Sequence, residues 1–175
     1  MPEHRDIHPE DRETMGRMPV ADLKGKTIIS LSNGEKIGQV DDVLVDPESL
    51  MVSGLLVTQG GLFDREKKII SAQDVDKWGK DTVLVSGIEV FHAEGELPGR
   101  EHWLSASDKL NGLTVVNTQG ERLGQIDDVI IDDSGRFVAY RVSSGMGRGD
   151  SREIPATATK TLGKDVAIVD TGRMA

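Results

Sequence analysis

The sequence predicts an all-β protein made of two tandem small antiparallel β-barrels, and an internal repeat is the main reason. Residues 34–46 read GEKIGQVDDVLVD, and residues 120–132 read GERLGQIDDVIID. Eight of the 13 aligned positions are identical, and the other five are conservative exchanges. A repeat of this length predicts two copies of one small fold. Short β-branched runs at regular spacing, separated by turn residues, predict barrels rather than helical layers.

The composition limits the classes of function. The 175 residues carry 21 Lys and Arg against 30 Asp and Glu, a net charge of −9, and six aromatic residues. A net negative field repels phosphate backbones, and few aromatic rings are present for base stacking, so we expect no DNA partner. The chain has no cysteine, and no apolar run reaches the roughly 18–20 residues that span a bilayer. Without an apolar segment near the N-terminus, we expect a cytoplasmic protein with no membrane span.

The repeat and the local composition together predict four segments. Residues 1–20 are polar, contain three prolines and lack periodicity, which is typical of a disordered N-terminal arm. The two barrels are predicted over residues 21–88 and 108–171. Residues 89–107 have no counterpart in the repeat, and their glycines and proline indicate a linker with Trp103 as its anchor on the barrels.

The first copy reads as a series of short strands joined by turns. Asn33-Gly34 is typical of a two-residue hairpin, because a type I′ turn needs positive φ at both positions. Gly38 lies inside the next strand and predicts a bulge or sharp bend, as closure of a small barrel requires. Residues 72–78 are expected to form a short helical turn or loop. The predicted strands cover residues 27–32, 35–45, 51–58, 67–71 and 82–85.

The second copy repeats this order. Gly120 occupies the first turn, and Gly124 occupies the bulge position within the next strand. Ahead of them, Ser105 begins a Ser-Ala-Ser-Asp run that offers an N-cap for a short helical turn entering the second barrel. A glycine-rich loop over residues 144–150 joins the third and fourth strands. The predicted strands cover residues 113–117, 122–131, 136–143, 152–154 and 166–169.

Further segments recur around the repeat, and together they resemble a known family. The segments are Leu23-x-Gly25-Lys26-x-Ile28, Leu110-x-Gly112, Ile70-Ser71-Ala72, Ile154-Pro155-Ala156 and the two repeats themselves. With these motifs, the chain resembles the PRC-barrel family, which includes the cytoplasmic domain of the photosynthetic reaction-centre H subunit and the C-terminal domain of the ribosome maturation factor RimM. The likeness implies a small β-barrel that serves as an interaction module. The chain shows neither the membrane segment of the H subunit nor the separate N-terminal barrel of RimM, so it resembles stand-alone bacterial tandem members.

The repeated aspartates are the candidate metal ligands, at positions Asp41, Asp42, Asp46, Asp127, Asp128 and Asp132. On an extended strand, the second and third aspartates of each copy share one face but lie about 13 Å apart. They cannot chelate one ion without further oxygens from loops. The competing interpretation is structural, because aspartates at strand ends start turns by bonding backbone amides. Recurrence in both copies favours the structural role.

Other patterns that carry chemistry are weak. His4, His8, His92 and His102 lack the spacing that is typical of a zinc site. The alternating glycines of residues 144–150 precede a strand, whereas a dinucleotide-binding loop opens a helix. The sequence contains no nucleophile elbow, P-loop or HExxH motif. We therefore expect neither an enzyme nor a bound cofactor.

The sequence favours a non-enzymatic protein-interaction or scaffold module that acts through barrel faces and loops. A stress-related role and self-association into a homo-oligomer are further expectations, and the protein partner stays unidentified. Loops on rigid barrels are frequent contact sites, and the equivalent loops of the two copies contain Leu62, Phe63, Met146 and Arg148. One alternative is a metal- or small-ligand-binding module that uses the repeated aspartates. Another, by family analogy, is a ribosome- or RNA-associated factor, although the net charge argues against it.

Overall fold

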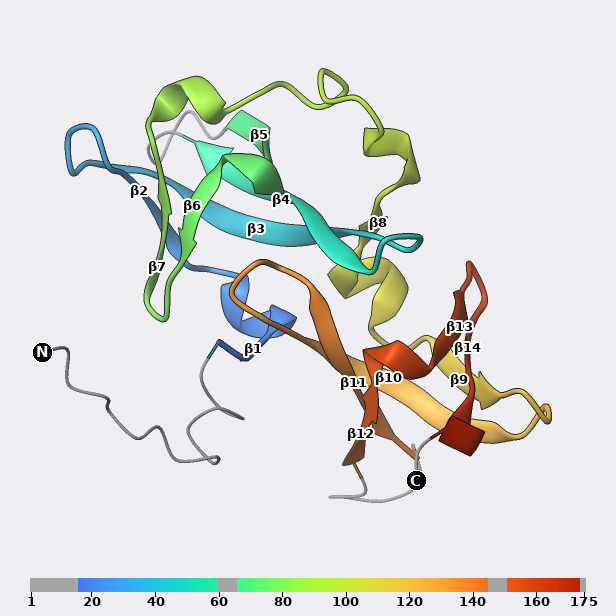
Figure 1. Ribbon diagram of the computed structural model, residues 1–175. Coiled ribbons are helices and arrows are strands. Elements are labelled where there is room, and N and C mark those ends of the chain that lie inside the picture. The colour runs from blue at the N-terminus through green and yellow to red at the C-terminus, as the bar shows by residue number, and fades with distance from the viewer. Residues whose placement is uncertain (1–15, 60–65, 145–150, 174–175) are drawn as a thin grey trace, which may run out of the picture.

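The computed structural model describes residues 16–59, 66–144 and 151–173, which form two curled β-sheets (Figure 1). In the first sheet the strand order is β5-β4-β3-β2-β7-β6, and in the second it is β12-β11-β10-β9-β14-β13. The first set of strands is β2 (Thr27–Ser30), β3 (Lys36–Asp46), β4 (Met51–Gln59), β5 (Glu66–Ser71), β6 (Val75–Trp78) and β7 (Thr82–Val85). The second is β9 (Thr114–Asn117), β10 (Arg122–Ile131), β11 (Phe137–Ser143), β12 (Ser151–Pro155), β13 (Thr159–Leu162) and β14 (Val166–Val169).

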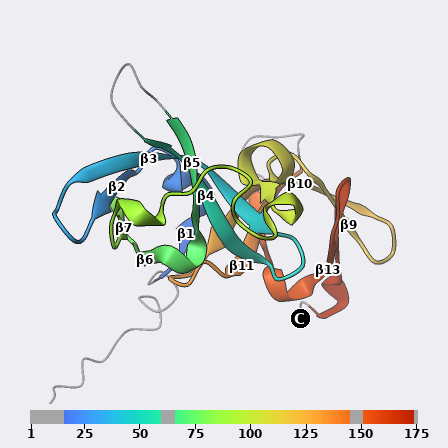
Figure 2. The ribbon, with the colours of Figure 1, turned by 90° about the horizontal axis from the view of Figure 1, so that it is seen from above.

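Strand for strand, the two sheets have the same topology, which confirms the predicted pair of tandem β-barrels. We call residues 20–92 the first half and residues 106–173 the second half. Figure 2 shows the two halves side by side. One feature differs from a purely antiparallel barrel, because β7 pairs in parallel with β2 and β14 pairs in parallel with β9. The β6–β7 and β13–β14 hairpins reverse the chain, so the returning strand runs in the same direction as the first strand of its half.

Burial follows the strand period and then departs from it where the halves meet. In β2, Ile28 is buried while its neighbours Thr27 and Ile29 are partly exposed, as expected for a sheet with one face on the core. In contrast, residues 42–45 of β3 are buried without alternation. A strand loses its alternation of buried and exposed residues where other elements pack against both of its faces. One continuous hydrophobic cluster contains buried apolar residues of both halves, so the halves share a core.

Two short strands cross between the halves. β1 (Met18–Pro19) lies just before the first half but pairs with β10 of the second, with Met18 opposite Ile131. β8 (Leu104–Ser105) lies just before the second half but pairs with β3 of the first, with Leu104 opposite Val45. Each half therefore receives a strand from the segment that introduces the other. β1 falls within the end of the predicted N-terminal arm, and β8 falls within the predicted linker over residues 89–107.

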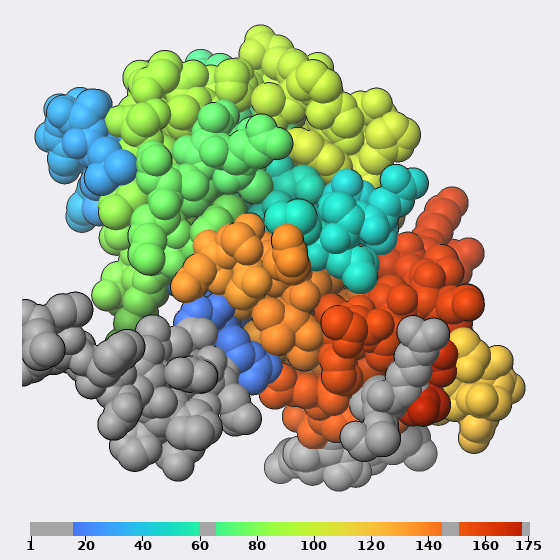
Figure 3. All heavy atoms as spheres, viewed as in Figure 1, coloured from blue at the N-terminus to red at the C-terminus, as the bar shows by residue number. Residues whose placement is uncertain are grey.

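The two long hairpins also meet at the centre of the molecule. The Val52 amide donates a hydrogen bond to the Gly135 carbonyl (2.8 Å), and the Phe137 amide donates to the Leu50 carbonyl (3.0 Å). Leu50 has a φ of 56°, the one positive φ at a non-glycine position in the described chain. Figure 3 shows the β10–β11 turn, in orange, seated against the first half. The halves are thus joined by backbone hydrogen bonds as well as by the core.

Short helical turns link the strands. Among the described residues, six are 3₁₀ turns and one, η5, is a π turn. In the residues that the structure describes, no helix is long and apolar enough to cross a membrane. The turns are η1 (Val20–Leu23), η2 (Ala72–Asp74), η3 (Ile88–Val90), η4 (Arg100–His102), η5 (Ala106–Leu110), η6 (Ala156–Ala158) and η7 (Thr171–Arg173).

Two local predictions need correction. The Asn33-Gly34 turn is not type I′, because Gly34 has a φ of 73° while Asn33 has no positive φ. The Asn33 carboxamide oxygen instead accepts the Glu35 amide hydrogen bond (3.0 Å), so the asparagine shapes the loop through its side chain. In residues 72–78, the helical turn η2 is followed by strand β6, which the sequence analysis missed. Its polar residues Asp76 and Lys77 are both exposed, at the edge of the sheet. The sequence therefore lacks the apolar–polar alternation that is typical of a strand.

Candidate functional site at the junction of the halves

Asp42 of the first half holds the segment that introduces the second half. Its carboxylate accepts hydrogen bonds from the hydroxyl groups of Ser105 and Ser107, the latter at 2.8 Å, and from the Val43 amide at 2.8 Å. The side chain is 8% exposed. Ser105 also caps η5, because its oxygen accepts the Asp108 amide hydrogen bond (3.1 Å), as the sequence predicts. Asp42 therefore fixes the β8–η5 segment through charge-assisted bonds.

Asp128 occupies the equivalent position in the second half. One oxygen, Oδ1, accepts hydrogen bonds from the Val129 amide (2.8 Å) and from the Ala21 amide of η1 (3.2 Å). Burial raises the pKa of this carboxyl above its usual value, although these two amides and the charge of Arg141 oppose the shift. Arg141 lies opposite Asp128 on β11. The same aspartate thus secures the introducing segment in each half, with a different donor.

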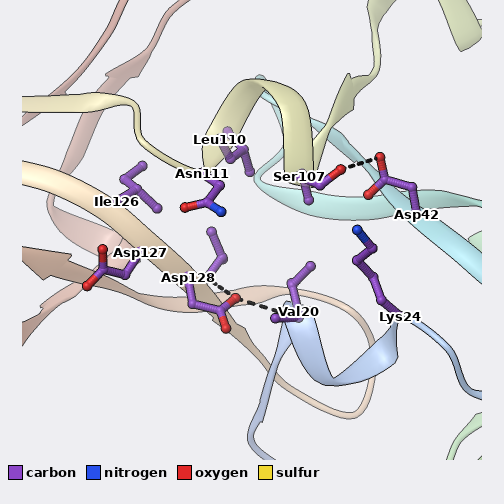
Figure 4. Close-up of a pocket in the computed structure, with 12 residues that line it drawn as sticks. Val20, Lys24, Asp42, Ser107, Leu110, Asn111, Ile126, Asp127 and Asp128 are labelled. Carbon is purple, nitrogen blue, oxygen red and sulfur yellow. Dashed lines mark hydrogen bonds between the residues drawn. The ribbon is translucent and has the colours of Figure 1, made fainter.

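A cavity of about 180 Å³ opens between these two contacts (Figure 4). Apolar residues from both halves line it, namely Val20, Ala21, Ala106, Leu110, Ile126 and Val129. Polar residues complete the lining, namely Lys24, Asp42, Ser107, Asn111, Asp127 and Asp128. Figure 4 shows Lys24 and Asn111 entering from opposite sides, with the lysine amine pointing toward the side where Asp42 lies. The cavity combines an aliphatic surface with an acidic margin.

The lining is pseudo-symmetric. Val20 begins η1 and Ala106 begins η5, and Lys24 and Asn111 follow the last residue of each turn. The cavity therefore lies where the equivalent turns of the two halves meet. Its two sides differ in charge because a lysine on one side is replaced by an asparagine on the other.

The remaining candidate aspartates do not converge on one another, and of these four only Asp127 lines the cavity. The Asp46 carboxylate accepts the Glu48 amide hydrogen bond (2.9 Å), and that of Asp132 accepts the Ser134 amide (2.9 Å) and the Arg136 amide (3.0 Å). Burial alone raises the pKa of Asp132, but hydrogen bonds from Ser134 and Arg136 together lower it below the usual value. These aspartates shape turns.

The first aspartate of each motif is also engaged elsewhere. Asp41 lies 3.8 Å from the Lys67 amine in an exposed ion pair. Asp127 lines the cavity, and its carboxylate accepts a hydrogen bond from the Ser143 hydroxyl (3.0 Å). Across the described ranges, no group of three or more His, Asp or Glu side chains is arranged to hold a metal ion.

The predicted turn and bulge residues serve close backbone approaches. Gly34 and Gly120 have φ values of 73° and 82° in equivalent turns. A Cβ on Gly38 would lie 2.9 Å from the Thr58 carbonyl oxygen, and one on Gly124 would lie 2.0 Å from that of Ser143. Register shifts lie beside both glycines in the pairing with β2 and β9.

The predicted interaction residues Leu62, Phe63, Met146 and Arg148 lie outside the described residues, as do His4 and His8. Of the other histidines, His92 forms a β-bridge with Ile69 at the edge of β5, and His102 is exposed in η4. The linker residue Trp103 packs near Gly54, where a Cβ would lie 2.8 Å from its ring.

Sequence reasoning missed Lys24, Asn111 and Ser107 as site residues. One signal was present for Lys24 and Asn111, because they follow Leu23 and Leu110, which occupy equivalent positions in the two copies. That alignment predicts equivalent places in the two barrels. It does not predict that the two places face each other across one cavity.

Comparison with known proteins agrees with this architecture. A family model described as the PRC-barrel domain matches residues 15–92 and again residues 104–173. An uncharacterised protein of Clostridium acetobutylicum is 30% identical over 73 residues, which is 39% of this chain and 84% of that protein. The matched length corresponds to one half, so the relative is similar to a single copy of the repeat.

Proposed function

The chain belongs to the PRC-barrel family, and from this premise we propose that it is a non-enzymatic interaction module whose two barrels act as one scaffold. The reciprocal exchange of β1 and β8 carries this proposal. Each barrel is completed by a segment attached to the other, and the two share a core. A partner that contacts both barrels would therefore meet surfaces held in one fixed arrangement, which lowers the ordering cost of binding.

The buried polar side chains of the described residues support a structural rather than a catalytic use. They are Ser30, Asp42 and Asn117. The Ser30 hydroxyl bonds that of Ser32 (2.8 Å), and the Asn117 side-chain oxygen accepts the amides of Gln119 (3.0 Å) and Glu121 (2.9 Å). With Asp42 engaged by serines, each buried group is used to hold a turn or a junction.

Capture of a partner by the full chain tests the proposal. The chain should retain a stoichiometric protein partner after chemical crosslinking in its native cell. Replacing Leu62 and Phe63, or Met146 and Arg148, by serine should abolish retention without lowering the Tm, because the sequence predicts these residues to lie in loops rather than in the barrel cores. Leu31→Ser, at a 56% exposed position in another loop, is the matched control. Undiminished retention by both loop variants, or no retained partner, would contradict the proposal.

The stress-related role, the cytoplasmic location and homo-oligomer formation stay predictions of this proposal. The metal-binding and ribosome-associated alternatives stay predictions of the sequence.

A further inference from the structure

The two sides of the junction cavity differ in how completely their carboxylates are bonded. Both oxygens of Asp42 accept hydrogen bonds, Oδ1 from the Val43 amide and Oδ2 from the hydroxyl groups of Ser105 and Ser107. In Asp128, Oδ1 accepts both hydrogen bonds. Within the described ranges, Oδ2 of Asp128 accepts none. The second half therefore presents a partly buried carboxylate oxygen with capacity for a donor.

Within the cavity lining, the cation that faces Asp42 has no equivalent on the Asp128 side. Lys24 points toward the Asp42 side of the cavity, whereas the equivalent residue on the Asp128 side is Asn111 (Figure 4). Arg141 lies opposite Asp128 on the neighbouring strand but does not line the cavity. Three aspartates and one lysine line the cavity, a formal charge of −3 + 1 = −2. The charge of the lining therefore favours a cationic occupant.

The apolar part of the lining restricts which cation fits. Val20, Ala106, Leu110, Ile126 and Val129 surround the space next to the aspartates. A small hydrated ion would leave these aliphatic groups unpartnered. An arginine side chain has three methylene groups that pack on apolar surface and a charged head that donates to carboxylates. Its chemistry matches both parts of the lining.

We propose that the junction cavity binds an arginine side chain of the protein partner, with its guanidinium donating to the Asp128 carboxylate and its methylene groups on the apolar lining. This inference rests on the proposed function and identifies one contact through which it would operate. Lys24 and Asn111 lie on opposite sides of the entering side chain. The lysine repels a second cation on the Asp42 side and so directs the guanidinium toward Asp128.

A tripeptide titration tests the site directly. The probe is acetyl-Ala-Arg-Ala-amide, added to the isotope-labelled full chain while amide chemical shifts are recorded. The amides of Ala21 and Val129 should shift with saturation, because both donate to Asp128. A Kd on the order of 1 mM is expected for one side chain. The control peptide carries citrulline, which has nearly the same shape without the charge, and should shift these amides little.

Two variants separate binding from folding. Asp128→Asn should weaken the arginine peptide by about fivefold or more, as loss of a charge pair of roughly 1 kcal/mol would. Asn111→Lys, at an exposed position, places a lysine beside Asp128 and should weaken binding to the same degree without lowering the Tm. Asp41→Asn, whose carboxylate is exposed and lies outside the cavity lining, should bind like the wild type.

Several outcomes would overturn the proposal. They are equal shifts with arginine and citrulline, no shift at about ten times the expected Kd, or unchanged binding by Asn111→Lys. Agmatine, a free amine with the same guanidinium, is the second arm. If it binds more than tenfold tighter than the peptide, the site takes small amines and the protein source is wrong. Partner retention by the full chain is measured separately, so a failed cavity with intact retention leaves the proposed function standing.

Discussion

The two halves share one topology but secure each other with different chemistry. Asp42 receives hydroxyl groups of Ser105 and Ser107, whereas Asp128 receives the backbone amide of Ala21. The turn that presents these donors is a four-residue 3₁₀ turn in η1 and a five-residue π turn in η5. η5 has one residue more than η1, and an inserted residue in a helical turn commonly produces a π turn. Both halves therefore place an aspartate acceptor at the junction, while the donor differs between them.

The core shared by the halves gives the largest expected effect. Leu23 ends η1 and Leu110 ends η5, and their exposures are 0% and 1%. Leu23→Ala and Leu110→Ala should each lower the free energy of unfolding by about 2–5 kcal/mol, because both leave cavities in the core. Calorimetry should show one unfolding transition that shifts in both variants. Two transitions, each sensitive to one variant, would show that the halves unfold independently.

The bulge glycines should come next and should differ between the halves. Gly124 has a φ of 147° and would place a Cβ 2.0 Å from the Ser143 carbonyl oxygen, whereas the approach at Gly38 is 2.9 Å. Gly124→Ala should cost about 3 kcal/mol of unfolding free energy, and Gly38→Ala about 1 kcal/mol. Urea denaturation measures both. Equal losses would mean that the strands move apart with similar ease in the two barrels.

The junction aspartates should show a smaller difference. Asp42→Ala removes the acceptor for two hydroxyl groups and one amide, and we expect a loss of about 2 kcal/mol. Asp128→Ala removes the acceptor for two amides only, and burial already raises the pKa of this carboxyl, so we expect about 1 kcal/mol. The same urea series compares them, with Asp41→Ala as the exposed control. A larger loss for Asp128 would reverse the ranking argued here.

The smallest effect is a pH dependence of opposite sign at two aspartates of the second half. The folded pKa of Asp128 is raised by burial, so the folded state holds its proton more tightly. Relative to Asp128→Asn, the wild type should therefore gain stability as pH falls through this folded pKa and toward the unfolded value of about 3.9. That contribution is lost again as pH rises.

Asp132 supplies the opposite control. Burial favours its protonated form, but the bonds from Ser134 and Arg136 outweigh burial and lower its folded pKa. Relative to Asp132→Asn, the wild type should lose stability as pH falls from the unfolded value of about 3.9 through the lower folded pKa. Denaturant midpoints measured across this range compare the two pairs. Slopes with pH that have the same sign for the Asp128 and Asp132 pairs would contradict the opposite pKa shifts of these two carboxyls.

The repeat predicted the architecture because it encodes local requirements. Gly124 permits a close strand crossing, and Asp132 starts a turn through its own side chain. Such requirements depend on neighbours in sequence or on the adjacent strand, so a short motif records them. The missed strands β6 and β13 each have one buried residue and two adjacent exposed polar residues. Their sequences therefore show little alternation of apolar and polar residues.

The junction could not be predicted because its contacts span long separations. Ala21 bonds a carboxylate 107 positions away, and Ser107 bonds one 65 positions away. Met18 and Pro19 read as the end of a polar arm until the partner strand is known. Lys24 and Asn111 read as ordinary surface residues. They matter because they line the cavity at the junction of the barrels, and no local sequence pattern specifies that junction.

The reciprocal crossing of β1 and β8 has a consequence for how such a protein can diverge. Two identical chains assembled in this way would carry the same side chain on both sides of the axis, and any change would appear twice. Covalent tandem linkage removes that constraint, so Lys24 and Asn111 can occupy matched places with unlike charge. A ligand in the junction cavity then has a single preferred orientation instead of two equivalent ones. Duplication thereby allows a symmetric junction to become a directional one.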